Sequence, residues 1–265
     1  MNRARRFNPS LYAALALGVA TGVAPAMSMA QTVRVAAGKP WTGYAGAGFG
    51  VFPKYTGGKG VEAVPVPLLL LEYKETFYVD FVRAGVRLWS SDDKKLALGL
   101  AAEPRFGYRA GDGALLVGMS RRRHSLEAGP NLEWETKFVS ISIGLFSDVT
   151  GASKGSSLRA LAYKQLIDNA QWDVGVYAGL EREDRKVTNY YFGVQTAEAI
   201  VNRPAYQPGA ASHGTLGIAG AWKFSPRYVL LFGIQNTRLG GAAAGSPIVE
   251  TRNAPLGYVG LGWQL

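Results

Sequence analysis

The sequence predicts an all-β protein that forms a single antiparallel β-barrel across an outer membrane. Three observations support this fold class: a short apolar segment near the N-terminus that suits export, no later apolar run long enough for a membrane helix, and a series of segments in which apolar residues alternate with polar or small ones. A barrel in lipid requires this alternation, because each strand turns one face to the membrane and the other to the lumen.

The first 30 residues are typical of a cleaved secretion signal. Arg3, Arg5 and Arg6 precede an apolar run at 11–25, and Ser28-Met29-Ala30 places small residues at the two positions that a signal peptidase reads. The run is shorter than the roughly 20 residues of a spanning helix. We therefore expect a signal peptide at 1–30 and one barrel domain at 31–265.

Composition excludes several classes of protein. The chain is 48% hydrophobic and holds 34 glycines, but lacks the continuous apolar stretches of a helical membrane protein. It has no cysteine, which excludes disulfides and thiol chemistry. Removing the three signal arginines lowers the net charge from +10 to +7, a balance that favours outer-membrane lipid and lipopolysaccharide phosphates. Nucleic acid is not an expected partner of an exported chain.

The alternation is clearest where Val139, Ile141 and Ile143 alternate with serine and glycine. A soluble β-sandwich also alternates, but Trp134 and Trp172 lie near segment ends, as an interfacial aromatic girdle requires. The pattern marks eleven candidate strands at residues 41–52, 61–73, 76–89, 95–109, 125–135, 137–149, 156–166, 172–181, 213–224, 228–239 and 255–265.

A bacterial single-chain barrel has an even number of strands and both ends in the periplasm. Residues 32–36 and 114–118 are candidates for a missing strand, which predicts about twelve strands, with about ten as the fallback. The alternation changes phase within 76–89 and predicts a bulge near Val82 and Arg83. The short turn at 225–227 is expected in the periplasm, and the long connections, such as 182–212 and 240–253, outside the cell.

Four motifs follow one another along the chain. They are Val-Pro-Val-Pro-Leu-Leu at 64–69, Gly-Met at 118–119, Thr-Asn-Tyr-Tyr-Phe-Gly-Val at 188–194 with Pro-Ala-Tyr at 204–206, and Ser-Pro-Ile-Val at 246–249. In this order they resemble the MltA-interacting protein (MipA/OmpV) family of outer-membrane proteins. The chain departs from the family at 148–155, where a glycine- and histidine-rich turn is usual, and ends in Leu265 where many barrels end in Phe.

The resemblance implies a multi-pass barrel in the outer membrane of a Gram-negative cell envelope. The resemblance implies the role of the best-described family member. That role is a scaffold that links a murein-degrading transglycosylase with a penicillin-binding protein in peptidoglycan metabolism. A murein hydrolase and a penicillin-binding protein are therefore the implied partners. A narrow channel for small solutes or antibiotics is the alternative, and a lipid-modifying outer-membrane enzyme is a more distant one.

Catalytic groups are sparse in this chain. His124 and His213 are the only histidines, and His124 and its neighbour Ser125 would point to opposite faces of a strand. Ser91 and Lys94 match a Ser-x-x-Lys spacing, but they lie in a polar turn and not at a helix start. We expect no enzyme activity, no metal and no cofactor.

Charged residues on three consecutive predicted strands are expected to face the lumen. A charge in a narrow lumen is costly unless it is paired and hydrogen-bonded. The favoured interpretation is a salt-bridged filling that closes the lumen, and the alternative is a narrow, charge-lined path for permeation. The residues are Arg83, Arg87, Glu103, Arg105, Glu127 and Glu133.

The predicted extracellular loop at 186–206 is rich in aromatic residues: Tyr190, Tyr191, Phe192 and Tyr206. Exposed aromatics make good anchors for a binding partner. The same residues would equally pack against one another as a lid over the mouth of the barrel, and the sequence favours neither interpretation.

Overall fold

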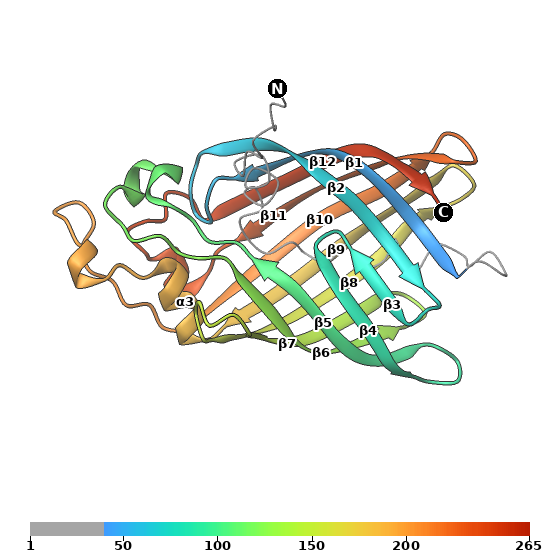
Figure 1. The fold of residues 1–265 in the computed structure, drawn as a ribbon, viewed down its shortest axis with the longest axis horizontal. Coiled ribbons are helices and arrows are strands. Elements are labelled where there is room, and N and C mark those ends of the chain that lie inside the picture. The colour runs from blue at the N-terminus through green and yellow to red at the C-terminus, as the bar shows by residue number, and fades with distance from the viewer. Residues whose placement is uncertain (1–39) are drawn as a thin grey trace, which may run out of the picture.

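The computed structural model describes residues 40–265, which fold as a closed antiparallel barrel of twelve strands (Figure 1). Each strand pairs with its neighbours in sequence, and β1 closes the barrel against β12. The expected signal peptide and the candidate strand at 32–36 lie outside the described residues. No helix in the described part of the chain is long and apolar enough to cross a membrane.

Strands make up most of the described chain. They are β1 (Trp41–Pro53), β2 (Val61–Tyr73), β3 (Phe77–Asp80), β4 (Arg83–Ser90), β5 (Leu96–Arg105), β6 (Ser125–Glu135), β7 (Ser140–Asp148), β8 (Ser156–Asp168), β9 (Trp172–Glu183), β10 (Ala211–Lys223), β11 (Tyr228–Arg238) and β12 (Asn253–Gln264). Short helices lie between strands, namely η1 (Ala110–Asp112), η2 (Ala114–Leu116), α3 (Arg185–Phe192), η3 (Thr196–Glu198) and α4 (Gly241–Ala244).

The bulge predicted near Val82 and Arg83 is wrong, because the chain reverses there and forms a hairpin. Strands β3 and β4 are joined at Phe81 and Val82, and Asp80 pairs with Arg83 across the turn. Phe81 takes a positive φ of 53°, and its amide donates to the Leu69 carbonyl at 2.6 Å. This reversal accounts for the change of phase. It also supplies the twelfth strand, whereas the candidate at 114–118 contains the helix η2.

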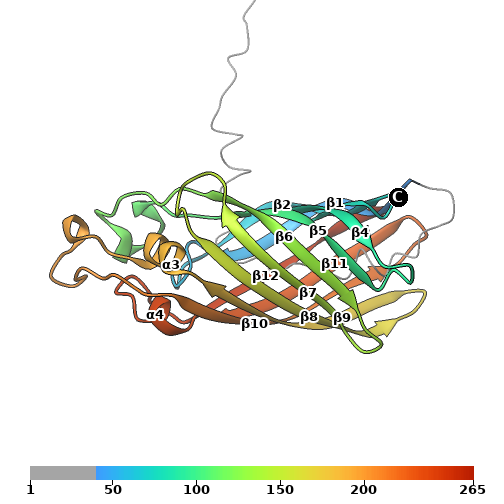
Figure 2. The same cartoon turned by 90° about the horizontal axis from the view of Figure 1, so that it is seen from below.

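The two ends of the barrel differ as predicted. Short connections of three to five residues lie at one end, where the Leu265 amide also donates to the Gly43 carbonyl at 3.0 Å. The long connections at 106–124, 184–210 and 239–252 gather at the other end, which carries α3 and α4 (Figure 2). The short-turn end with the C-terminus is therefore periplasmic, and the long-loop end is extracellular.

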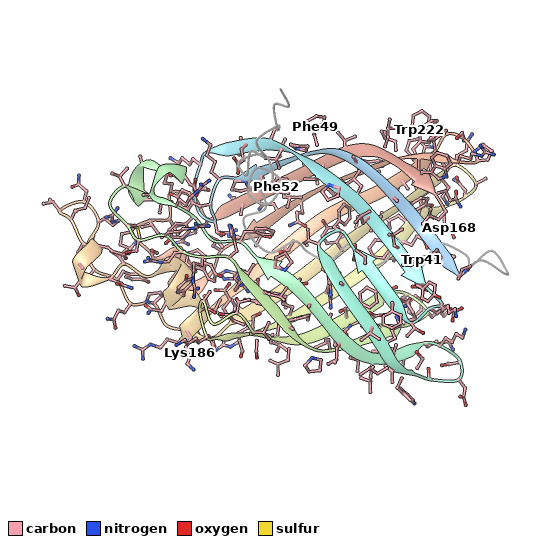
Figure 3. All side chains as sticks on the ribbon, in the orientation of Figure 1. Trp41, Phe49, Phe52, Asp168, Lys186 and Trp222 are labelled. Carbon is pink, nitrogen blue, oxygen red and sulfur yellow. The ribbon has the colours of Figure 1, made fainter. Side chains whose placement is uncertain are left out.

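The outer wall carries a girdle of tryptophans near its periplasmic end. All six tryptophans of the chain point outward and are 38–51% exposed: Trp41, Trp89, Trp134, Trp172, Trp222 and Trp263. Figure 3 shows Trp41 and Trp222 near the end opposite Lys186. Indole rings favour the interface between lipid and water, so this ring of side chains fixes the depth of the barrel in the membrane.

The seam between β1 and β12 depends on glycine. Gly46 pairs with Gly262, and Gly48 pairs with Gly260. A Cβ on Gly46 would lie 2.0 Å from the Leu261 carbonyl oxygen, and one on Gly48 would also meet backbone. The two strands approach this closely only because these positions have no side chain.

Candidate functional site

The predicted lumen charges meet one another inside the barrel, in two groups. The first group surrounds Arg87. Its Nε donates to a Glu133 carboxylate oxygen at 2.7 Å, and its Nη1 donates to Glu72 at 2.9 Å. The Arg87 guanidinium also lies 5.0 Å from the centre of the Tyr78 ring. This arginine therefore ties β2, β4 and β6 together across the lumen face.

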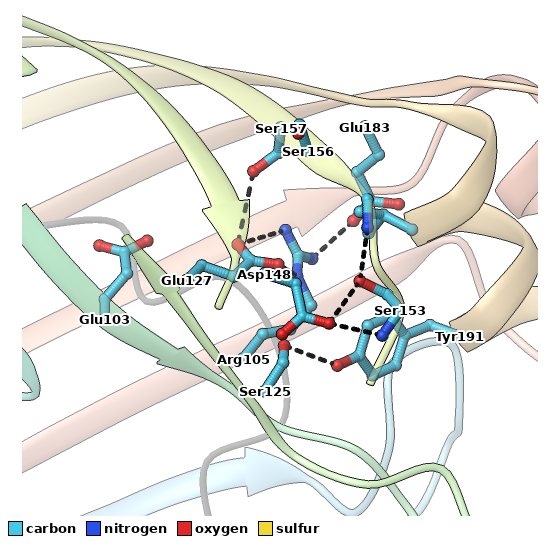
Figure 4. Close-up of polar contacts among 12 residues, drawn as sticks. Glu103, Arg105, Ser125, Glu127, Asp148, Ser153, Ser156, Ser157, Glu183 and Tyr191 are labelled. Carbon is cyan, nitrogen blue, oxygen red and sulfur yellow. Dashed lines mark hydrogen bonds and ion pairs between the residues drawn. The ribbon is translucent and has the colours of Figure 1, made fainter. Parts of the chain in front are cut away.

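The second group surrounds Arg105 (Figure 4). Its Nε donates to Glu127 at 2.6 Å, and its Nη1 donates to Glu183 at 2.6 Å. The Arg105 side chain is 8% exposed, and those of Glu127 and Glu183 are 1% and 2% exposed. Both guanidinium edges are thus held by buried carboxylates, and Arg105 forms a further ion pair with Glu181.

A second arginine, three strands further along the barrel wall, completes this group. Arg159 of β8 forms ion pairs with Glu103 and Glu127, and its Nε donates to Glu181 at 2.9 Å. Its guanidinium lies 5.0 Å from the centre of the Phe146 ring. The network therefore spans β5 to β9 and joins strands that are far apart in the sequence.

Arg83 is the least satisfied member of the predicted set. Its Nε lies 3.8 Å from Glu103, beyond hydrogen-bond range, and its guanidinium faces the Phe146 ring at 5.2 Å. Within the described chain, neither Nε nor Nη2 of Arg83 makes a hydrogen bond, and the same holds for Oδ1 of the buried Asp80. These buried polar atoms therefore lack a hydrogen-bond partner within the described chain.

A cluster of apolar side chains fills the lumen on the periplasmic side of the Arg105 group. Leu68 and Leu70 of β2 meet side chains of β1 and of β8 to β11, and all are buried. The turn residue Phe81 packs against this cluster from the β3–β4 hairpin, with its ring 4.9 Å from that of Tyr258. The other members are Tyr44, Leu161, Tyr163, Tyr177, Ala219, Ala221, Val229 and Leu231.

The aromatic loop folds inward over the mouth. Tyr191 and Phe192 of α3 are buried, and the Tyr191 hydroxyl lies 2.9 Å from Ser125 Oγ. Tyr190 is partly buried, and its carbonyl accepts from Arg122 Nε at 2.8 Å. Tyr206, also partly buried, donates to a carbonyl of α4. The four aromatic residues therefore make contacts within the extracellular loops.

Two buried arginines tie these loops to one another. Arg122 donates to both carboxylate oxygens of Glu198, at 2.8 and 2.7 Å. Burial raises the pKa of Glu198, but the hydrogen bonds from Arg122 and from two backbone amides outweigh it and lower the pKa to about 2. Arg203, 2% exposed, donates to the carbonyls of Leu115 and Val117. The loop at 106–124 is thereby fixed to the loop at 184–210.

The comparisons with known proteins agree with this architecture. The family model described as MltA-interacting protein MipA matches residues 45–265. The chain belongs to the MipA family. Outer membrane protein Omp26La of Vibrio anguillarum is 30% identical over 136 residues, and outer membrane protein OmpV of Vibrio cholerae is 29% identical over the same length. Each match covers 51% of this chain and 52% of the relative, so the chain spans about half the length of these curated relatives.

A solved structure of the NanC porin is also similar in fold. It is 12% identical, has a TM-score of 0.47, and covers 84% of this chain and 100% of its own. Family membership and the closed twelve-stranded barrel together place this MipA-family chain in the bacterial outer membrane.

The histidines of this MipA-family chain do not form a nucleophile pair. His124 Nδ1 accepts from the Gly107 amide at 3.0 Å, while Ser125 bonds to Tyr191. His213 Nε2 lies 3.4 Å from a carboxylate oxygen of Glu183. The described residues contain no group of three or more metal-ligating side chains. The relatives named above are outer-membrane proteins.

Four members of the lumen network were not singled out from the sequence of this MipA-family chain. Arg159 and Glu181 occupy inward positions of predicted strands, so the alternation could have identified them. Glu183 lies beyond the predicted end of its strand. Glu72 faces the lumen, as do Leu68 and Leu70 on the same strand. Its pairing with Arg87, however, depends on the β3–β4 hairpin, which brings Arg87 close to β2.

Proposed function

We propose that this MipA-family chain is a non-enzymatic scaffold that holds peptidoglycan enzymes at the outer membrane. The partners are a lytic transglycosylase of the MltA kind, which the family's name specifies, and a penicillin-binding protein. The observation that carries the proposal is the filled lumen. A barrel whose interior is occupied by its own side chains acts through its two ends, and murein lies at the periplasmic end.

Two layers of side chains support a closed lumen. The apolar cluster includes Leu68, Leu70 and Leu231, each with no exposed surface. On its extracellular side, Arg105 and Arg159 hold carboxylates of β5, β6 and β9. Water crosses such a layer poorly, because a packed, mainly apolar cluster offers few hydrogen bonds and both arginines are already paired with carboxylates.

The periplasmic turns form a rigid surface. In the turn at 136–139, Thr136 Oγ1 donates to the Val139 carbonyl at 2.7 Å and accepts from two backbone amides. Phe138 stands out from this turn with 72% of its surface exposed, beside Lys137. A pre-ordered turn with an exposed aromatic residue binds a partner at a low entropic cost.

The neighbouring turn at 91–95 is ordered by its own side chains. Asp93 accepts from Ser91 Oγ at 2.7 Å and from Lys95 Nζ at 2.9 Å. These hydrogen bonds, with that from Lys95 the strongest, lower the pKa of Asp93 to about 2. The turn therefore presents fixed charges at neutral pH beside the aromatic residue.

A binding measurement with paired variants tests the scaffold. The folded protein in detergent is titrated with a purified lytic transglycosylase of the MltA kind, and Phe138→Ser is compared with Val201→Ser. Val201 is fully exposed in an extracellular loop and is the matched control. We expect Phe138→Ser to weaken binding about tenfold, a typical loss for an interface aromatic, and Val201→Ser to leave it unchanged. Equal affinities for both variants, or no binding by the unaltered protein, would contradict the scaffold.

A narrow path for small solutes is the second candidate. It is favoured by the unsatisfied atoms of Arg83 and Asp80 in the middle of the lumen. In this case replacing Arg83 and Arg87 by alanine changes the conductance and ion selectivity of the protein in a planar bilayer. Unchanged conductance together with lower heat stability excludes the path and leaves a structural network.

A further inference from the structure

The β3–β4 hairpin spans only part of the barrel height. Strand β3 pairs with β2 from Leu70 to Tyr73, and β4 pairs with β5 no further than Ala102. Residues 61–69 of β2 and 103–105 of β5 therefore have no ladder partner on the side where the hairpin would continue. In Figure 1 the hairpin between β2 and β5 ends well short of the extracellular loops. We call this interruption of the wall the wall slot, and its floor is the turn at 81–82.

Prolines face the wall slot from both edges. The Leu69 carbonyl accepts from the Phe81 amide, so Leu69 directs its backbone toward the slot side of β2. Backbone direction alternates along a strand, and Pro67 and Pro65 therefore face the same side. On β5, Pro104 lies two residues beyond Ala102, the last residue paired with β4. Proline has no N–H and is confined to unpaired edges, so this sequence is suited to a wall that stays open.

These prolines also argue against a peptide as the occupant. A strand that adds to a sheet edge needs a row of backbone donors and acceptors. Pro65 and Pro67 remove two donors from the β2 edge, and Pro104 removes one from the β5 edge. The wall slot faces the outer leaflet of the membrane, because it occupies the extracellular part of the wall.

The sides of the wall slot suit an acyl chain. Outward positions on its edges are apolar, including Ala63, Pro65, Pro67 and Pro104. Behind the β2 edge, Val66 packs against the apolar lumen cluster, to which Phe81 also belongs. An acyl chain that enters between the two edges therefore contacts apolar side chains on the β2 side and at the floor of the slot.

A pocket with cationic side chains lies directly above the wall slot. It has a volume of about 70 Å³ and is lined by Lys54, by Glu62 near the start of β2, and by the loop that follows β5. Lys54, Arg109 and Arg121 are exposed at this pocket. Arg122 is neutralised by Glu198, and Asp112 is engaged by the Arg109 backbone amide at 2.7 Å. Three exposed cations outnumber the two carboxylates Glu62 and Asp112 at this pocket, and the net positive charge favours a phosphate.

We propose that the wall slot binds a phosphorylated lipid of the outer leaflet, with an acyl chain between the edges of β2 and β5 and a headgroup phosphate on Lys54, Arg109 and Arg121. Lipid A has the chemistry of such a ligand, because it carries acyl chains below a phosphorylated sugar. This binding is independent of the periplasmic partners proposed above.

Binding of purified lipid A by the folded barrel in detergent, followed by native mass spectrometry, tests the headgroup contact. The variant Lys54→Gln/Arg109→Gln/Arg121→Gln is compared with Arg182→Gln/Arg185→Gln/Lys186→Gln, which removes three exposed cations from another extracellular site. We expect the affinity for lipid A to fall at least tenfold in the first variant and less than twofold in the second. Equal losses, or equal binding of dephosphorylated lipid A by the unaltered protein, would overturn the proposal.

Photo-crosslinking tests the acyl chain. A benzophenone attached to the Val66→Cys variant, at a position that faces inward at the slot, should crosslink to lipid A. The same label at Thr215, which faces inward on the fully paired strand β10, should not. Similar crosslinking yields at both positions would overturn the proposal that the acyl chain lies in the wall slot. Loss of the Val66 crosslink on addition of millimolar inorganic phosphate alone would assign the cationic pocket to free phosphate and would also overturn the proposal.

Discussion

Replacing Arg105 by methionine removes the centre of the larger lumen network and leaves its carboxylates without their main partner. Glu127 and Glu183 are at most 2% exposed, so solvent cannot compensate for the loss. Breaking a buried ion pair in this way costs about 3–5 kcal/mol. For a chain of this size each kcal/mol lowers the melting temperature by about 2–4 °C. The expected shift is therefore about 6–20 °C.

The assay is the temperature at which the folded barrel in detergent loses its characteristic gel mobility. Lys94→Met is the matched control, since it breaks an ion pair with Glu75 whose side chains are 69% and 44% exposed. Such surface pairs contribute about 0–1 kcal/mol, so the control should shift by less than about 4 °C. Adding Glu127→Gln and Glu183→Gln to Arg105→Met should recover much of the lost stability. A shift for Arg105→Met no larger than that of the control would refute a structural role for the network.

Two further predictions concern the seam and the loops. Gly48→Val should lower the folded yield severely, because a Cβ there would lie 2.2 Å from the Val259 carbonyl oxygen; Gly111→Val, with no atom within 4 Å, should fold normally in the same refolding assay. The pKa of Glu198, about 2 in the folded protein against an ordinary 4.5, means that its ion pair with Arg122 stabilises the loops above pH 4.5 and is lost as the pH falls toward 2. Hydrogen exchange in the extracellular loops should rise over that range, and Glu198→Gln should abolish the change; an identical pH profile in the variant would contradict this assignment.

Period-two alternation predicted most of the strands because lipid imposes it on every wall segment. The sequence 137–149 shows this clearly, since Ile141, Ile143 and Leu145 face outward in β7 as expected. The β3–β4 hairpin was missed because a two-residue reversal inside one alternating segment looks like a bulge. Only the pairing of Asp80 with Arg83 distinguishes the two.

The lumen network could be predicted in part. The inward phase identified Arg105 and Glu127, but their partners come from β8 and β9, which no local pattern connects to β5. The closure of the loops depends on Arg203 and on the pair between Arg122 and Glu198, which are separated by 76 or more residues from some of their partners. Contacts of that kind follow from barrel geometry and not from sequence spacing.

The central claim is that this MipA-family barrel has a filled lumen and acts through its ends. Its most direct test is the conductance of the purified, folded protein in a planar bilayer at moderate voltage. A filled lumen predicts no stable single-channel steps above those of the bare bilayer. Reproducible steps that change in size or selectivity in Arg83→Ala would contradict it and assign the lumen charges to permeation.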